Sequence, residues 1–285
     1  MKSIRLQSPA KLNLILEVIN KRPDGYHNLK TLFERIDLSD TISLTANRSG
    51  SIRIFCQHPQ VPKGPKNLVY QVAKILQKDF KVAQGVDIRI IKRIPVAAGL
   101  AGGSSNAATV LVGLNKLWGL SLSLKQLVVY GKKIGSDAPF FLYNCSWALG
   151  TGRGDRIKKI KISTKLWHIL ITPNVKMYTR KVFGSLNLKL TKQRGNVNIL
   201  THSLRRNDLS RVGRLLSNDL ESSILQLRPQ LLRIKEKLES FPVAGVSFSG
   251  SGPSVFGITK SKNQAQAIRA ILRRRYKQIF VVRTF

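Results

Sequence analysis

Residues 94–111 read IPVAAGLAGGSSNAATVL, in which a proline and a run of small residues lead into an alanine-led apolar stretch with helical character. Glycines tolerate positive φ and let a ligand approach main-chain N–H groups closely. The unpaired amides and positive dipole end of a following helix favour an anion. Ser104 and Ser105 can cap that helix or touch a phosphate or its Mg²⁺. We interpret the segment as a phosphate-binding loop, with a glycine-rich turn that only caps a core helix as the alternative.

Two familiar phosphate-binding patterns are absent from the sequence. There is no GxxxxGK[ST], and the loop does not spell GxGxxG, so a P-loop NTPase and a dinucleotide-binding fold are both disfavoured. No apolar run approaches the roughly 20 residues that span a bilayer, and the N-terminus alternates like a strand without a leader pattern. Two cysteines, Cys56 and Cys145, are too few for a disulfide framework. We therefore expect a cytoplasmic protein with no membrane partner.

The chain is strongly basic, with 49 Lys and Arg residues, 14 Asp and Glu residues and a net charge of +35. The basic residues are spread along the whole sequence rather than gathered in a stripe or tail, as a polynucleotide footprint would require. We favour a composition bias together with attraction for anionic small molecules. A basic nucleic-acid-binding protein remains the alternative from a different functional class, and it predicts tight, salt-sensitive binding.

Because acidic residues are scarce, Asp137 in KKIGSDAPFFLYN is informative. It is the single carboxylate between Asp87 and Asp155, and an apolar run follows it. A partly desolvated carboxylate near positive charge suits a general base or a metal ligand. An N-cap or turn aspartate ahead of a proline explains the same pattern, and the segment alone does not separate the two.

The chain alternates strand and helix signals in the order of an α+β protein. We predict strands near residues 4–18, 33–46, 51–57 and 86–94, and helices over 67–80, 105–118 and 123–134. In the second half we predict a strand from Leu166, helices near 178–187, 207–216, 228–240 and 262–274, and strands at 243–250, 254–259 and 278–285. Glycines and lysines replace apolar residues near 151–163, so we place one domain at residues 1–155 and another at 156–285.

Five motifs in order resemble the GHMP kinase superfamily. They are PAKLNLIL at 9–16, RPDGYHNL at 22–29, PVAAGLAGGSSNAA at 95–108, GSDAPFF at 135–141 and SGSGPSVFG at 249–257. The resemblance covers essentially the whole chain. It implies an N-terminal domain like domain 2 of ribosomal protein S5, which would bind ATP, and a C-terminal ferredoxin-like α+β sandwich.

The match is most similar to the branch of that family that phosphorylates the 2-hydroxyl of 4-diphosphocytidyl-2-C-methyl-D-erythritol in the non-mevalonate pathway of isoprenoid precursor biosynthesis. The resemblance implies ATP and Mg²⁺ as cofactors and two anionic small molecules as partners. It assigns no protein residue as a metal ligand. No specific nucleic acid is expected, and the protein is expected to be a monomer or a homodimer.

The resemblance also implies roles for individual residues. Asp137 matches the catalytic base and Lys11 the lysine beside it that would hold the aspartate ionised and orient the hydroxyl. An ATP-binding loop would comprise Pro95, Val96, Ala97, Ala98, Gly99, Leu100, Ala101, Gly102, Gly103, Ser104 and Ser105. Residues similar to substrate-binding ones are Asn13, Tyr26, His27, Thr179 and Phe183, and a supporting glycine motif is Gly250, Ser251 and Gly252. Tyr26 would stack on the cytosine ring and His27 would bond the base edge.

The chain departs from the usual family pattern at two positions. Ala101 replaces the second glycine of the common GLGGGSS, and a methyl group costs about 1 kcal/mol if that position needs positive φ. Asn106 stands where many members carry aspartate. Other family members that act on homoserine or mevalonate, and an inactive homologue, are nearer alternatives. The proposed cytidine contacts in RPDGYH argue against the first, and retention of Lys11 and Asp137 argues against the second.

Overall fold

A computed structural model describes residues 2–187 and 196–285. The chain forms two compact units that are not consecutive in sequence, because the long strands β1 (Ser3–Lys21) and β2 (His27–Asn47) each run from one unit into the other. Unit 1 comprises Met1–Ala10, Leu38–Val96 and Ala101–Asn144, and unit 2 comprises Lys11–Asp37, Ala97–Leu100 and Cys145–Phe285. The boundary that we predicted between residues 155 and 156 stays a prediction.

Unit 1 contains a sheet built on the second half of β2. Strand β4 (Gly85–Ile91) pairs antiparallel with it, from Thr41 opposite Ile91 onward, and β3 (Ile52–Cys56) pairs parallel with β4. Buried and less buried residues mostly alternate in β3 and β4, as in half-buried strands, whereas residues 39–42 of β2 are all buried. The strands predicted near 4–18, 33–46 and 51–57 are confirmed, although β1 and β2 are longer than the sequence pattern indicates.

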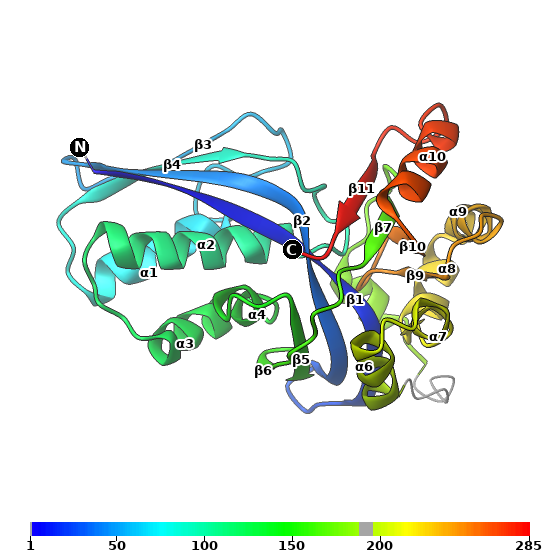
Figure 1. The fold of residues 1–285 in the computed structure, drawn as a ribbon. Helices are drawn as coiled ribbons and strands as arrows, with labels where there is room; N and C mark the ends of the chain where they lie inside the picture. The colour runs from blue at the N-terminus through cyan, green and yellow to red at the C-terminus, as the bar shows by residue number, and fades with distance from the viewer. Residues whose placement is uncertain (1, 188–195) are drawn as a thin grey trace. The chain divides into compact units, whose positions relative to one another are not determined.

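Four helices of unit 1 lie together on one side of these strands (Figure 1). They are α1 (Leu68–Asp79), α2 (Gly102–Leu117), α3 (Leu124–Ile134) and α4 (Ala138–Leu142). Asn67 caps α1, and Ser123 with Gln126 forms a capping box on α3. Helix α2 packs tightly on β2, since a Cβ atom added at Gly113 would lie 2.3 Å from a methyl group of Leu44. The sequence predicted the first three helices but not α4, which is entirely buried.

In unit 2, the first half of β2 pairs antiparallel with β5 (Trp147–Gly152), which pairs in turn with β6 (Arg156–Lys159). Strand β1 pairs parallel with the two-residue strand β8 (Ser217–Asn218). A second sheet has the order β11-β7-β10-β9, with antiparallel neighbours. Its strands are β7 (Trp167–Ile171), β9 (Gly245–Phe248), β10 (Val255–Thr259) and β11 (Ile279–Arg283).

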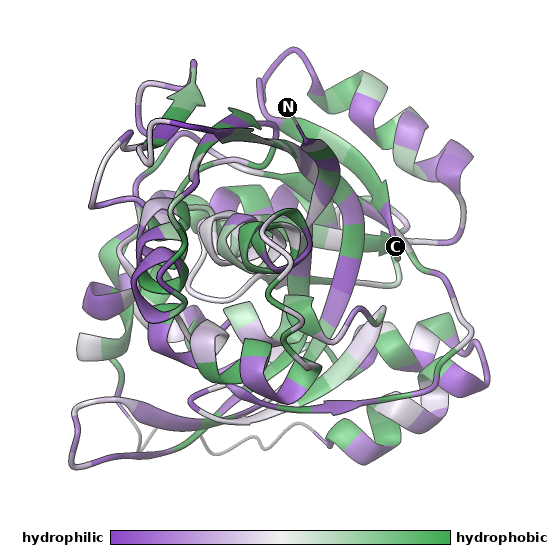
Figure 2. Ribbon diagram, turned by 90° about the vertical axis from the view of Figure 1, so that its left-hand side faces the viewer, coloured by the Kyte–Doolittle hydropathy of each residue, from purple (hydrophilic) through white to green (hydrophobic). Residues whose placement is uncertain are grey.

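The helices of unit 2 are short. They are α5 (Thr179–Gly184), α6 (Val197–Arg205), α7 (Leu209–Arg214), α8 (Glu221–Leu227), the 3-10 helix η2 (Pro229–Leu231), α9 (Leu232–Glu239) and α10 (Lys262–Leu272). Helix α10 is amphipathic, with Ala265, Ile268 and Leu272 buried at helical spacing. Figure 2 shows the resulting alternation of hydrophobic and hydrophilic segments along the helices. The sequence analysis missed α6, α8, β5 and β6.

No helix in the described part of the chain is long and apolar enough to cross a membrane.

Candidate active site

The glycine loop connects β4 to α2 through an irregular backbone. Ala97, Gly99 and Ala101 have φ values of 54°, 75° and 54°. The sequence-based concern about Ala101 is therefore confirmed, because this alanine adopts the left-handed conformation that glycine adopts without strain. The strain amounts to about 1 kcal/mol, and the surrounding contacts hold the loop in this shape despite it.

Helix α2 begins directly after this strained residue. The Ser105 N–H donates to the Ala101 carbonyl at 2.9 Å, while the amides of the first turn before it lack intrahelical partners. No side chain caps the helix, so the serines do not serve as caps. Ser105 is fully buried with its hydroxyl 2.8 Å from that of Ser8, whereas Ser104 is half-buried and Gly103 is exposed. The start of α2 thus offers backbone amides and one accessible serine hydroxyl to an anion.

A buried carboxylate, Asp40 on β2, ties the two ends of the loop together. Its Oδ1 accepts hydrogen bonds from the N–H groups of Arg93 and Ile94, at 2.7 and 2.8 Å. Its Oδ2 accepts from Lys92 Nζ at 2.7 Å and from Asn106 Nδ2 at 2.9 Å. Asp40 is fully buried, so four donors compensate its desolvation.

We call Asp40, Lys92, Asn106, Ser8 and Ser105 the Asp40 cluster. Asn106 also donates to the Ser8 hydroxyl at 2.9 Å, which links the cluster to the helix that follows the loop. Burial lowers the pKa of Lys92, and the neighbouring Asp40 carboxylate partly opposes that shift. The departure from the family pattern at Asn106 has a local reason, because a carboxylate there would face Asp40. The sequence analysis missed Asp40, for which the only indication is an acidic residue within a predicted strand.

In unit 2, the middle of the glycine loop contacts the second glycine motif. A Cβ atom added at Gly99 would lie 2.1 Å from the Ser249 carbonyl oxygen, so only glycine fits. The Ser249 hydroxyl donates to the Gly99 carbonyl at 3.0 Å. The Lys11 N–H donates to the Leu100 carbonyl at 3.2 Å. The two glycine motifs, which are 150 residues apart, therefore form one backbone surface together with β1.

The predicted residues Lys11 and Asn13 lie on that surface. They occupy alternate positions of β1 and so share a face, and Lys11 Nζ donates to Asn13 Oδ1. A Cβ atom at Gly250 would lie 3.2 Å from Lys11 Nζ and 3.3 Å from Asn13 Oδ1. Asn13 Nδ2 donates to the Thr31 hydroxyl at 2.7 Å. Lys11 is 4% exposed, so it is not the surface lysine that its abundance in the chain would suggest.

The other predicted substrate residues fall into two groups of unit 2. Thr179, the first residue of α5, has its hydroxyl 3.0 Å from that of Ser251 in the second glycine motif. His27 stacks on Phe183 of the same helix, with ring centroids 5.2 Å apart. Tyr26 precedes β2 and is 54% exposed. Burial, and then the charge of Lys21, lower the pKa of His27, so its imidazole is neutral at pH 7.

Asp137 belongs to unit 1 and occupies the N-cap position of α4. The N-cap position fits the alternative that the sequence left open, although the side chain makes no capping hydrogen bond. Two residues earlier, a Cβ atom at Gly135 would lie 3.6 Å from the Ser104 hydroxyl, which places this segment beside the start of α2. The carboxylate is half-buried. Its expected pairing with Lys11 stays a prediction.

Comparison with known proteins agrees with this arrangement. The GHMP kinase N-terminal domain family matches residues 67–145, and the GHMP kinase C-terminal family matches residues 200–278. A 4-diphosphocytidyl-2-C-methyl-D-erythritol kinase of Exiguobacterium sibiricum is 41% identical over 99% of this chain and 98% of its own. The protein of that name from Geobacillus kaustophilus is 43% identical over 98% and 96%.

Solved structures give the same grouping. A crystal structure of 4-(cytidine 5'-diphospho)-2C-methyl-D-erythritol kinase superposes with a TM-score of 0.83, at 28% identity, over 98% of both chains. The expected two-domain α+β fold is therefore confirmed. The chain belongs to the GHMP kinase family, in the group of the 4-diphosphocytidyl-2-C-methyl-D-erythritol kinases.

Proposed function

We propose that this kinase transfers the γ-phosphoryl group of ATP to the 2-hydroxyl of 4-diphosphocytidyl-2-C-methyl-D-erythritol, giving the 2-phosphate and ADP. The names of the relatives support this acceptor. The observation that carries the proposal is the meeting of three separate motifs in unit 2, where Lys11 and Asn13 lie against Gly250 and the Gly99 segment contacts Ser249.

In this proposal the loop from Pro95 to Ser105 binds the ATP phosphates through backbone amides. The exposed backbone at Gly103 fits this role, since the nearest atom to a Cβ added there would be 3.8 Å away. Fixed amides of this kind stabilise charge on a transferring phosphoryl group without reorganising. Gly250, Ser251 and Gly252 support the loop from the second motif. Thr179 would border the same site through its contact with Ser251.

Asp137 takes the proton of the acceptor hydroxyl as its oxygen attacks the γ-phosphorus, and the bond from that phosphorus to the ADP oxygen breaks. Lys11 keeps the carboxylate ionised and orients the hydroxyl. Mg²⁺, when bound, neutralises charge on the phosphates. The half-buried Ser104 hydroxyl is the loop oxygen that fits this hard cation. Among the described residues, no group of three or more His, Cys, Asp or Glu side chains could hold a metal ion.

Tyr26, His27 and Asn13 would bind the cytidine end of the acceptor, and Phe183 would border it through its stacking on His27. The excess of basic residues attracts both anionic substrates. We infer that the protein acts in the cytoplasm, as a monomer or homodimer, without a specific nucleic-acid or membrane partner.

The acceptor is tested by ADP release with three compounds offered separately, namely 4-diphosphocytidyl-2-C-methyl-D-erythritol, mevalonate and homoserine. We expect turnover with the first only, and phosphorus NMR of the product should show a phosphate ester at the 2-position. Turnover with either of the others alone would contradict the assignment. Anisotropy titrations with labelled RNA and DNA should show only weak binding that salt abolishes. Tight binding with a steep salt dependence would favour the nucleic-acid alternative.

A further inference from the structure

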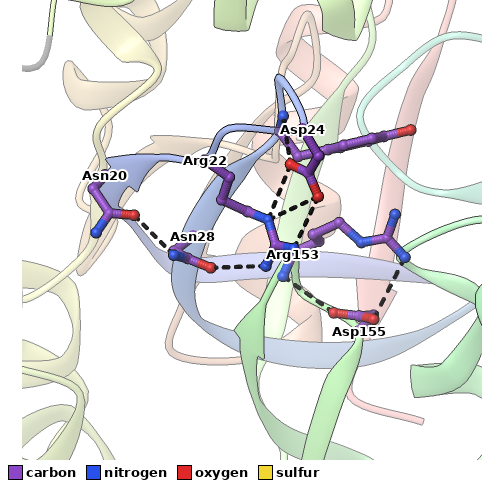
Figure 3. A network of polar contacts seen from close by, with 7 residues as sticks. Asn20, Arg22, Asp24, Asn28, Arg153 and Asp155 are labelled. Carbon is purple, nitrogen blue, oxygen red and sulfur yellow. Dashed lines mark hydrogen bonds and ion pairs between the residues drawn. The ribbon is translucent and has the colours of Figure 1, made fainter.

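Two turns of unit 2 meet around Tyr26, and the proposed mechanism uses none of their residues except Tyr26 itself. One is Arg22–Tyr26, which joins β1 to β2, and the other is Arg153–Asp155, the RGD sequence that joins β5 to β6. They lie side by side because β5 pairs with β2 near its start, with Gly152 opposite Leu29. Figure 3 shows the polar contacts within each of the two turns.

The first turn fixes the backbone of Tyr26. The Arg22 guanidinium donates to both carboxylate oxygens of Asp24, at 3.1 Å from Nε and 2.8 Å from a terminal nitrogen. Asp24 Oδ1 accepts the Tyr26 N–H at 3.1 Å, and the Arg22 N–H donates to the Tyr26 carbonyl at 2.8 Å. A further donor of Arg22 reaches Asn28 at 3.2 Å. Both backbone groups of Tyr26 are therefore engaged, and its Cα position is set by the turn.

The second turn fixes the ring of Tyr26. The Arg153 guanidinium carbon lies 4.9 Å from the ring centroid. Arg153 is held in place by Asp155, whose Oδ1 accepts the Arg153 N–H at 3.1 Å and whose Oδ2 lies 3.6 Å from the guanidinium. The Asp155 side chain is 13% exposed. Tyr26 remains 54% exposed despite this contact, so part of the ring surface is left for a ligand.

We propose that Arg153 is a positioning residue for the substrate, which backs the Tyr26 ring so that the ring presents its remaining surface to the cytosine base. The inference rests on the proposed function, because the base belongs to that acceptor. A guanidinium stacks well on an aromatic face and is planar, so it restrains the ring in a way that an ammonium does not. A ring ordered before binding loses less conformational freedom when the base arrives.

The main competing role for Arg153 is direct contact with the diphosphate of the substrate. A phosphate contact would act independently of Tyr26, whereas a positioning residue acts only through that ring. Kinetics of single and double variants separate the two roles, since effects that share a partner are not additive.

The experiment measures KM and kcat for 4-diphosphocytidyl-2-C-methyl-D-erythritol in Arg153→Met, Tyr26→Leu and the double variant. We expect Arg153→Met to raise KM about 3- to 10-fold, the range for one side chain that must be immobilised on binding, with kcat within about twofold of wild type. Arg153→Lys should recover part of the loss. In the Tyr26→Leu background Arg153→Met should have no further effect. Arg156→Met, which removes the same charge from exposed β6, is the matched control and should leave KM unchanged.

If the increases in KM of the two single variants multiply in the double variant, a phosphate contact replaces the positioning role. An unchanged KM in Arg153→Met would overturn the proposal altogether. A second measurement needs no substrate. The ring signal of Tyr26 in the NMR spectrum of tyrosine-labelled protein, assigned with Tyr26→Leu, should shift in Arg153→Met and stay in place in Arg156→Met. A signal that does not move contradicts the inference. Failure of the proposed function is distinct, because it appears as no turnover by the wild-type protein.

Discussion

The Asp40 cluster of unit 1 and the Arg22–Tyr26 turn of unit 2 both pair an aspartate with a basic side chain, but they differ in burial. In each, one aspartate accepts backbone N–H groups and pairs with a basic side chain. Asp40 and Lys92 have side chains 0% and 6% exposed, whereas those of Asp24 and Arg22 are 44% and 32% exposed. Removing one partner of a buried pair leaves an uncompensated charge, whereas water replaces a lost exposed partner. The first cluster therefore supports the fold of the glycine loop, and a change in the second should have little effect on stability.

The largest effect should come from Asp40→Ala. It removes the acceptor of four donors and leaves the Lys92 ammonium buried without its counter-charge. We expect the free energy of unfolding, measured by urea denaturation followed by circular dichroism, to fall by about 3–5 kcal/mol. Asp87→Ala breaks a partly exposed pair with Arg53 and a hydrogen bond from Asn47, and it is the control, with a much smaller loss expected. Equal losses of free energy of unfolding in the two variants would contradict the difference that we infer between buried and exposed ion pairs.

The next largest effect on stability should come from adding a second carboxylate to the Asp40 cluster. Asn106→Asp places a second carboxylate where the Asn106 amide now donates to Asp40, and we expect a loss of about 2 kcal/mol in the free energy of unfolding. The double variant Asp40→Asn with Asn106→Asp restores one amide and one carboxylate, and it should recover at least half of that loss. The KM for ATP should follow the same order. If the double variant loses as much free energy of unfolding as the two single variants together, the contact between the Asn106 amide and Asp40 does not cause the loss.

A smaller effect should follow from relaxing the loop backbone. Ala101→Gly relieves about 1 kcal/mol of strain at φ 54°, but a glycine there adds about 0.4–1 kcal/mol of entropy to the unfolded chain. The free energy of unfolding should therefore change by less than about 1 kcal/mol. Ala108 is buried inside helix α2, and Ala108→Gly should lower the free energy of unfolding by about 1 kcal/mol or more. A large loss in Ala101→Gly, measured by the same denaturation, would mean that the methyl group packs against the loop.

The smallest expected effect is a dependence of stability and of the KM for the cytidine substrate on the protonation of His27. Burial and Lys21 lower the pKa of His27, so the unfolded chain binds this proton at a higher pH than the folded protein does. Stability from the neutral imidazole is then present above pH about 6.5 and is lost as the pH falls through the lowered pKa. The KM for the cytidine substrate should be flat from pH 8 to 6.5 and rise only below it. His27→Gln should remove the rise, and a midpoint above 6.5 would contradict the assignment.

The sequence was most informative where local chemistry decides the structure. The strained position at Ala101 and the helix after the glycine loop could be predicted, because each depends on a short pattern. The Asp40 cluster could not, since it joins residues that meet only when β2 packs against the start of α2. The sequence analysis also missed β5, β6, α6 and α8, and length alone is not the reason, because the six-residue helices α5 and α7 were predicted. The proximity of the RGD turn to Tyr26 could not be predicted either, because it depends on the pairing of β5 with β2.

We propose that Asp137 accepts the proton of the substrate hydroxyl and that the glycine loop binds ATP. The most direct test compares wild-type protein with Asp137→Asn for ADP release in the presence of ATP, Mg²⁺ and 4-diphosphocytidyl-2-C-methyl-D-erythritol, with ATP binding measured by calorimetry. We expect kcat to fall by about 100-fold or more, as for removal of a general base, and the Kd for ATP to stay within about threefold. A variant that keeps more than about a tenth of the wild-type kcat would contradict it.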